Sequence, residues 1–168
     1  MHALYLVSVW MHILAAAVWL GGAAFIALVL VPLVHRPGAT LVSAGVMRAI
    51  VMRYRTVGWA SLAVLIVTGC ANLGLRGIGW EACLTGAIFH GGFGKALAIK
   101  LSLVASLIVI SAFHDFYLGP RAAKIILEQP GTASAAAARR RASRFGRVVL
   151  MLGVLAVFAA VILVRGFP

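Results

Sequence analysis

The side chains best suited to chemistry in this sequence are its histidines, and His12 is the most informative of them. It lies in an apolar run from Ala3 to Val34 that is otherwise interrupted only by Tyr5 and Ser8. A polar side chain inside a membrane span usually faces a bundle interior, a cavity or a cofactor, because a partner must offset its desolvation. His12 is therefore a candidate ligand, and the alternative is a hydrogen-bonded packing residue.

A second polar group lies in the third apolar segment, which contains Lys100, Ser111, His114 and Asp115. At about 100° per residue, Lys100 and His114 share one helix face, and they lie about 21 Å apart along the axis. Lys100 either pairs with an anionic group or extends its ammonium to the headgroups. His114 and Asp115 either form an inner site or end the helix in contact with solvent.

Further donors and small residues surround His12 in the sequence. Met11 supplies a thioether and His90 an imidazole, and such soft and imidazole donors suit Cu(I). Trp19 follows His12 by seven residues and so lies on nearly the same helix face. The small residues 21–24 allow a second helix or a flat cofactor to approach, although helix packing alone also explains glycines there.

The composition predicts that these residues are positioned by membrane-spanning helices. Hydrophobic residues make up 64% of the chain, charged residues only 11%, and the mean hydropathy is +1.10. Four apolar segments are each about long enough to cross a ~30 Å hydrocarbon core. They cover residues 3–34, 57–73, 96–118 and 148–164. We therefore predict an all-α fold, a polytopic four-helix bundle, with residues 1–168 forming one four-span domain.

The ends of these segments carry their own signals. The first would measure about 48 Å as a helix, so we expect it to tilt or project, with Pro32 and the pair Pro37-Gly38 marking its end. Residues 40–52 are candidates for a helix preceding the second span. Residues 129–132 should break the chain, and the alanine-rich run from Ser134 should lead helically into the fourth span. We find no convincing internal repeat and no separate soluble domain.

The basic residues predict the topology. The first and third connections hold 11 of the 15 Lys and Arg residues, so both should be cytoplasmic and both termini outside. They are Arg36, Arg48, Arg53, Arg55, Arg121, Lys124, Arg139, Arg140, Arg141, Arg144 and Arg147. No Lys or Arg precedes residue 36, which favours a retained first span over a cleaved signal peptide. Cys70 and Cys83 would both lie on the outer side, where a disulfide and two reduced thiols remain alternatives.

The charge and the acidic residues exclude other classes of function. A net charge of +12 is compatible with nucleic-acid binding, but the arginines cluster beside membrane ends, where anionic lipid and span orientation explain them. We therefore predict the lipid bilayer as a partner and no nucleic acid. The only acids are Glu81, Asp115 and Glu128, and no paired-carboxylate, Ser-His-Asp or phosphate-loop pattern occurs. These absences argue against carboxylate-based hydrolysis, and whether the chain is an enzyme stays open.

Several of these segments together resemble the copper resistance protein D family of membrane proteins. The stretch from His12 to Gly22, His-Ile-Leu-Ala-Ala-Ala-Val-Trp-Leu-Gly-Gly, is similar to that family's first-span motif. The resemblance continues, in order and spacing, through residues 53–55 (Arg-Tyr-Arg), the pair Thr68-Gly69, and residues 94–101. It covers roughly residues 10 to 120, and each motif alone is short and apolar.

The resemblance implies a multi-pass protein of the bacterial inner (plasma) membrane that takes part in copper handling or uptake. Copper would then meet His12, Met11 and His90 on the outer side and His114 on the inner side, and a periplasmic copper protein or a larger membrane complex would be the partner. The chain departs from the family in lacking a Met-rich or His-rich extracellular domain and paired cysteines within its spans.

A second resemblance, to the HemJ-like protoporphyrinogen oxidase family, implies a heme b protein. His12 would then ligate the heme iron, Trp19 would line the macrocycle, and Lys100 would pair with a propionate. The positive ammonium of Lys100 is attracted by a propionate, whereas a bound metal cation would repel it. Residues 26–36 lack the aromatic and basic pattern expected after the first span of that family. A third interpretation is a non-catalytic accessory subunit of a membrane complex.

Overall fold

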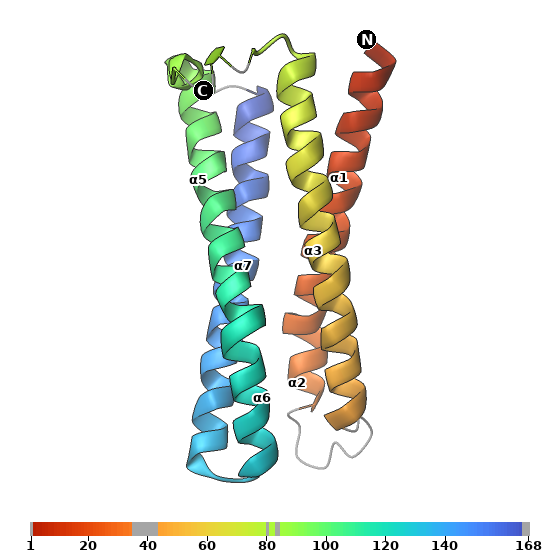
Figure 1. Cartoon of the computed structure of the whole chain (residues 1–168), viewed down its shortest axis with the longest axis vertical. Coiled ribbons are helices and arrows are strands. Elements are labelled where there is room, and N and C mark those ends of the chain that lie inside the picture. Colours follow the sequence, from red (N-terminus) through yellow and green to blue (C-terminus); the bar gives the residue numbers. More distant parts are fainter. Residues whose placement is uncertain (1, 35–43, 80, 83–84, 166–168) are drawn as a thin grey trace. The chain divides into compact units, whose positions relative to one another are not determined.

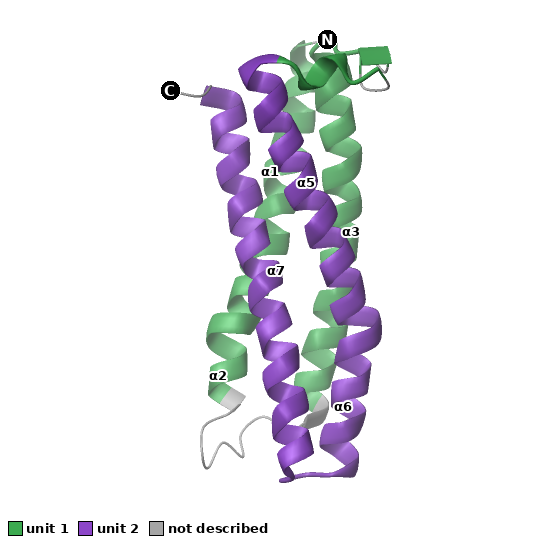
Figure 2. Ribbon diagram, turned by 90° about the vertical axis from the view of Figure 1, so that its left-hand side faces the viewer, with its two compact units in different colours: residues 1–90 green, residues 91–168 purple. Residues whose placement is uncertain are grey.

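The computed structural model describes residues 2–34, 44–79, 81–82 and 85–165, and it confirms the all-α prediction (Figure 1). Four helical stretches are long and apolar enough to cross a membrane. They cover His2–Leu33, Val46–Leu75, Gly91–Glu128 and Ala133–Arg165. The chain divides into two compact units, Met1–His90 (unit 1) and Gly91–Pro168 (unit 2), which are coloured separately in Figure 2.

Unit 1 is a pair of long antiparallel helices (Figure 1). The first comprises α1 (His2–Phe25), a π-helical turn η1 (Ile26–Leu30) and α2 (Val31–Val34), and the second is α3 (Ala44–Leu75). A short 3₁₀ turn, η2 (Ala87–Phe89), follows. Cys70 is an exposed thiol of α3, and Cys83 lies outside the described residues, so the disulfide stays a hypothesis.

Pro32 lies two residues before Val34, where the first helix ends among the described residues and where the first apolar segment was predicted to end. Proline has no N–H, and its ring clashes with the carbonyl four residues earlier, here that of Leu28. The π turn immediately before Pro32 widens the helix at that carbonyl, and π turns of this kind are common single-turn insertions in α-helices. The other predicted stop, Pro37-Gly38, lies outside the described residues.

The second and fourth helices begin well before their apolar segments. Helix α3 starts at Ala44 rather than at residue 57, which confirms a helix over residues 44–52 ahead of the second span. Hydropathy marks only the part of a helix that suits lipid, whereas Ala, Met and Arg continue it outside the apolar stretch. The helices therefore extend beyond the apolar segments, and the predicted number of membrane-spanning helices, four, is confirmed.

Unit 2 has the same plan of two long antiparallel helices (Figure 1). The first comprises α5 (Gly91–Phe113), a π turn η3 (His114–Leu118) and α6 (Gly119–Glu128), and the second is α7 (Ala133–Arg165). The predicted break at residues 129–132 is confirmed: Gly131 has a φ of +78°, and Thr132 caps α7 by accepting the Ala135 N–H at 3.2 Å. The alanine-rich run is helical into the fourth span, as predicted.

Candidate functional site

His12 lies on the side of α1 that packs against α3, where it meets Thr68. The distance from His12 Nδ1 to Thr68 Oγ1 is 2.8 Å. The Thr68 hydroxyl also donates to the Val64 carbonyl at 2.6 Å. In the tautomer that carries its proton on Nδ1, His12 donates to the Thr68 oxygen, and Nε2 is the basic nitrogen.

The surroundings of this pair come from the same two helices. Ser8, one turn before His12, donates a long hydrogen bond of 3.5 Å to the Thr68 carbonyl. Gly69 packs against the imidazole, since a Cβ built there would lie 3.6 Å from His12 Cε1. His12 itself is half-buried. The ring is thus held at its Nδ1 side by a hydroxyl and at its edge by the backbone of α3.

Two turns further along α1, Trp19 joins a second set of contacts with α3. Its carbonyl accepts a hydrogen bond of 2.8 Å from the Tyr54 hydroxyl, and its side chain is only 6% exposed. A Cβ at Gly22 would overlap the Tyr54 ring, lying 2.8 Å from Cδ2, while one at Gly58 would lie 3.7 Å from Trp19 Cδ1. Gly22 is therefore required for the close approach of the tyrosine ring.

A third contact joins the ends of α1 and α3. Arg76 Nε donates to the Tyr5 hydroxyl at 2.9 Å, and the guanidinium carbon lies 5.7 Å from the centre of the Tyr5 ring. Polar contacts thus occur at three levels of the unit 1 helix pair, namely Tyr5 with Arg76, His12 with Thr68, and Trp19 with Tyr54. The motifs that carry the family resemblance in α1 and α3 are contact residues of one another.

The other predicted outer donors belong to unit 1 as well. Met11 is 40% exposed and, as the neighbour of His12 on α1, points about 100° away from it around the helix. His90 is exposed and follows η2 directly. Across the described part of the chain, no three His, Cys, Asp or Glu side chains form a group that could hold a metal ion.

The predicted inner residues lie in unit 2. His114 Nδ1 is 2.9 Å from Asp115 Oδ1, and the two side chains are 26% and 27% exposed. They occupy the π turn η3, after which the helix continues through α6, so the interpretation of His114 as a helix terminus is wrong. Lys100 is half-buried on α5. Ser111 is 5% exposed, and its hydroxyl has no hydrogen-bond partner among the described residues.

Sequence reasoning missed that Thr68 and Tyr54 are the residues of α3 that meet α1. A signal was present for Thr68, because the apolar segment 57–73 contains few polar side chains and threonine is one of them. Its partner was not evident, because nothing in a single apolar helix shows which face meets a particular residue 56 positions away. Tyr54 gave no such signal, since it lies among arginines at the edge of the segment.

The four membrane-crossing helices and the His12–Thr68 contact define a polytopic membrane protein with polar groups held between its helices. A family model, copper resistance protein D, matches residues 48–163. This chain belongs to that family. No curated protein and no solved structure matches it. The family match covers α3 and most of unit 2 but begins after α1, so it includes Thr68, Lys100 and His114 and not His12.

Proposed function

We propose that this protein binds copper in the membrane and handles it there, or takes it up, with His12 as a ligand. Membership of the copper resistance protein D family supports this function. The observation that carries the role of His12 is its hydrogen bond to Thr68, because ligating histidines almost always donate the other ring N–H to a fixed acceptor. The bond orients the ring and leaves the electron pair on Nε2.

The donors near His12 suit copper in its reduced state. Soft thioether and imidazole ligands favour Cu(I) over the hard cations. Met11 adjoins His12 in the sequence but points away from it, and His90 belongs to the same unit. A site that uses all three donors therefore requires side-chain movement, which the flexible Met side chain allows. His12, Met11 and His90 are the proposed outer donors.

We propose His114 as the inner donor. Its Nδ1 faces the Asp115 carboxylate, an arrangement that orients the imidazole. The bacterial inner membrane, with both termini outside, is the proposed location, since the basic residues cluster in the first and third connections. A periplasmic copper protein or a larger membrane complex at the outer side is the proposed partner.

The test is copper binding by the protein purified in detergent under reducing conditions, measured by metal analysis and absorption spectroscopy. We expect copper to bind the wild-type protein and not the His12→Ala variant. Thr68→Ala should weaken binding by about 10–100-fold, the usual effect of removing a partner of a ligating histidine, and Thr68→Ser, which keeps the hydroxyl, should restore it. His2→Ala, which removes an exposed histidine, is the matched control.

A Soret band that His12→Ala abolishes, without bound copper, would overturn the copper proposal in favour of heme b. In that case Trp19 and Lys100 become the residues to test for contact with the macrocycle and a propionate. Absence of both copper and heme, together with unchanged copper accumulation in cells carrying His12→Ala, would leave an accessory subunit as the best description.

A further inference from the structure

Units 1 and 2 share an unusual helix design. In each, the first helix contains one five-residue π turn, Ile26–Leu30 in unit 1 and His114–Leu118 in unit 2, 88 positions apart. The N–H groups of Val31 and Gly119 close these turns on the carbonyls of Ile26 and His114. π turns are rare, so their recurrence at one spacing points to a common design rather than chance.

The residues around the π turns recur at the same spacing. The pattern Ala-Phe-x-x-x-x-Leu-x-Pro occupies residues 24–32 and again residues 112–120. The leucine of each pattern is buried, as Leu30 and Leu118. In both units the proline follows the π turn by two residues and the helix continues beyond it.

The second helices of the units agree as well. Helix α3 has 32 residues and α7 has 33, and each begins in a basic stretch and ends in an apolar one. Six pairs of identical residues in these two helices occur at the same spacing of 88 positions. They are Ala49 and Ala137, Arg53 and Arg141, Gly58 and Gly146, Leu62 and Leu150, Ala71 and Ala159, and Leu75 and Leu163.

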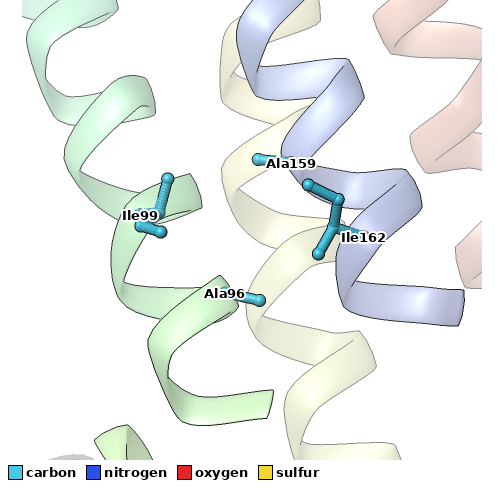
Figure 3. Close-up of a pocket in the computed structure, with 4 residues that line it drawn as sticks. All are labelled: Ala96, Ile99, Ala159 and Ile162. Atoms are coloured by element: carbon cyan, nitrogen blue, oxygen red, sulfur yellow. The ribbon is translucent and has the colours of Figure 1, made fainter. Parts of the chain in front are cut away.

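The pairing of the two helices is similar in the two units. In unit 2, a small apolar pocket between α5 and α7 is lined by Ala96, Ile99, Ala159 and Ile162 (Figure 3). The position equivalent to Ala96 in unit 1 is Ser8, which contacts the backbone of Thr68, and the equivalent of Ala159 is Ala71, one turn further along α3. The two pairings therefore agree to within about one helical turn.

The spacing of 88 positions identifies the counterparts of the His12–Thr68 pair. Lys100 lies 88 positions after His12, each stands 20 residues before its proline, and both are half-buried. The counterpart of Thr68 is Ala156. Unit 2 therefore lacks both the imidazole and the hydroxyl that orients it. A protonated lysine has three donors and no lone pair, and its charge repels a cation.

We infer that the chain consists of two diverged copies of one two-helix unit, and that Lys100 and Ala156 are the second copy of the His12–Thr68 position, with the lysine excluding metal there. Internal structural repeats occur in many membrane transporters. The inference about metal rests on the proposed function, whereas the inference about the repeat does not. The chain should accordingly bind copper through one such position and not through two.

The repeat is tested by disulfide cross-linking, which does not depend on copper. In full-length protein carrying C70S and C83S, cysteine pairs are introduced as H12C with T68C and as K100C with A156C. Both pairs should form a disulfide under mild oxidation. S106C with A156C is the matched control, because Ser106 lies on another face of α5 and should not cross-link. Cross-linking of the unit 1 pair without the unit 2 pair would overturn the inference.

The chemical part is tested by moving the site. The His12→Ala variant loses copper if the proposed function holds. Adding I99M, K100H and A156T to H12A rebuilds the Met11, His12 and Thr68 positions in unit 2 and should restore copper binding. The control is H12A with I99M, S106H and A156T, which should not. Both variants are first checked to be folded and helical. The role of Lys100 would be overturned if copper bound only the control, or if copper bound neither variant. Failure of the wild-type protein to bind copper would contradict the proposed function instead, and the cross-links would still decide the repeat.

Discussion

The helix pairs of units 1 and 2 have the same plan but are held together by different chemistry. In unit 1, side-chain hydrogen bonds join α1 to α3 at Trp19 and Tyr54 and at His12 and Thr68. In unit 2, the contacts described between α5 and α7 are apolar, such as Phe113 against Phe145 with ring centres 5.7 Å apart. The two units thus have similar backbones, but hydrogen bonds join the helices of unit 1 whereas apolar side chains pack between those of unit 2.

This difference matters because lipid tails are as apolar as the helices themselves. Helices in a membrane associate through close packing and interhelical hydrogen bonds rather than through burial from water. Unit 1 uses both, with Gly22 admitting the tyrosine ring and Tyr54 donating to the backbone of α1. The polar contacts of unit 1 therefore both stabilise the helix pair and orient the residue that we propose as a ligand.

Among the changes that test this difference between the units, Gly22→Ala should lower the stability of the protein most. A Cβ at this position overlaps the Tyr54 ring, so α1 and α3 must move apart. Overpacking of this kind costs about 1–3 kcal/mol, which a lower midpoint of thermal unfolding in detergent would reveal. Gly21→Ala is the control, because nothing lies within 4 Å of its Cβ. Equal stability of the two variants would contradict the close packing of unit 1.

Tyr54→Phe should have the next largest effect. It removes the hydrogen bond to the Trp19 carbonyl while keeping the ring that fills the space beside Gly22. Interhelical hydrogen bonds in membranes contribute about 0.6 kcal/mol on average and up to about 1.7 kcal/mol. The unfolding midpoint should fall by a corresponding amount. If the midpoint does not change, this hydrogen bond orients the two helices of unit 1 but does not stabilise the protein against unfolding.

A smaller loss is expected from Phe145→Leu in unit 2. This change keeps an apolar side chain but removes the aromatic contact with Phe113, and aromatic pairs contribute about 0.5–1.5 kcal/mol beyond their buried area. Leucine recovers part of that packing. A loss larger than that of Tyr54→Phe in the same unfolding assay would reverse the ranking of the two interfaces.

The smallest change, and one of opposite sign, is expected for Ser111→Ala. The Ser111 hydroxyl is buried in unit 2 without a hydrogen-bond partner among the described residues. Removing such a group relieves its desolvation cost, so stability should stay equal or rise by about 1 kcal/mol at most. A clear loss of stability would show that this hydroxyl bonds to a group such as water or a ligand in the membrane.

Much of the fold was predictable from the sequence, because transfer of apolar segments into lipid is a local property. The number of spans and the break at residues 129–132 are confirmed. The π turn beside Pro32 was not predictable, because hydropathy does not reveal how a proline inside a helix is accommodated. The internal repeat was also not evident, since it consists of a helix design and a few residues rather than extended identity.

By itself, the sequence determined that four helices cross a membrane and that one of them carries a costly histidine at residue 12. Only the tertiary structure decided that Thr68 meets His12 and that Tyr54 meets Trp19. The physical reason is that hydropathy sums contributions of single residues along one helix. Partner choice depends on how two helices are rotated and aligned, which only their packing together specifies.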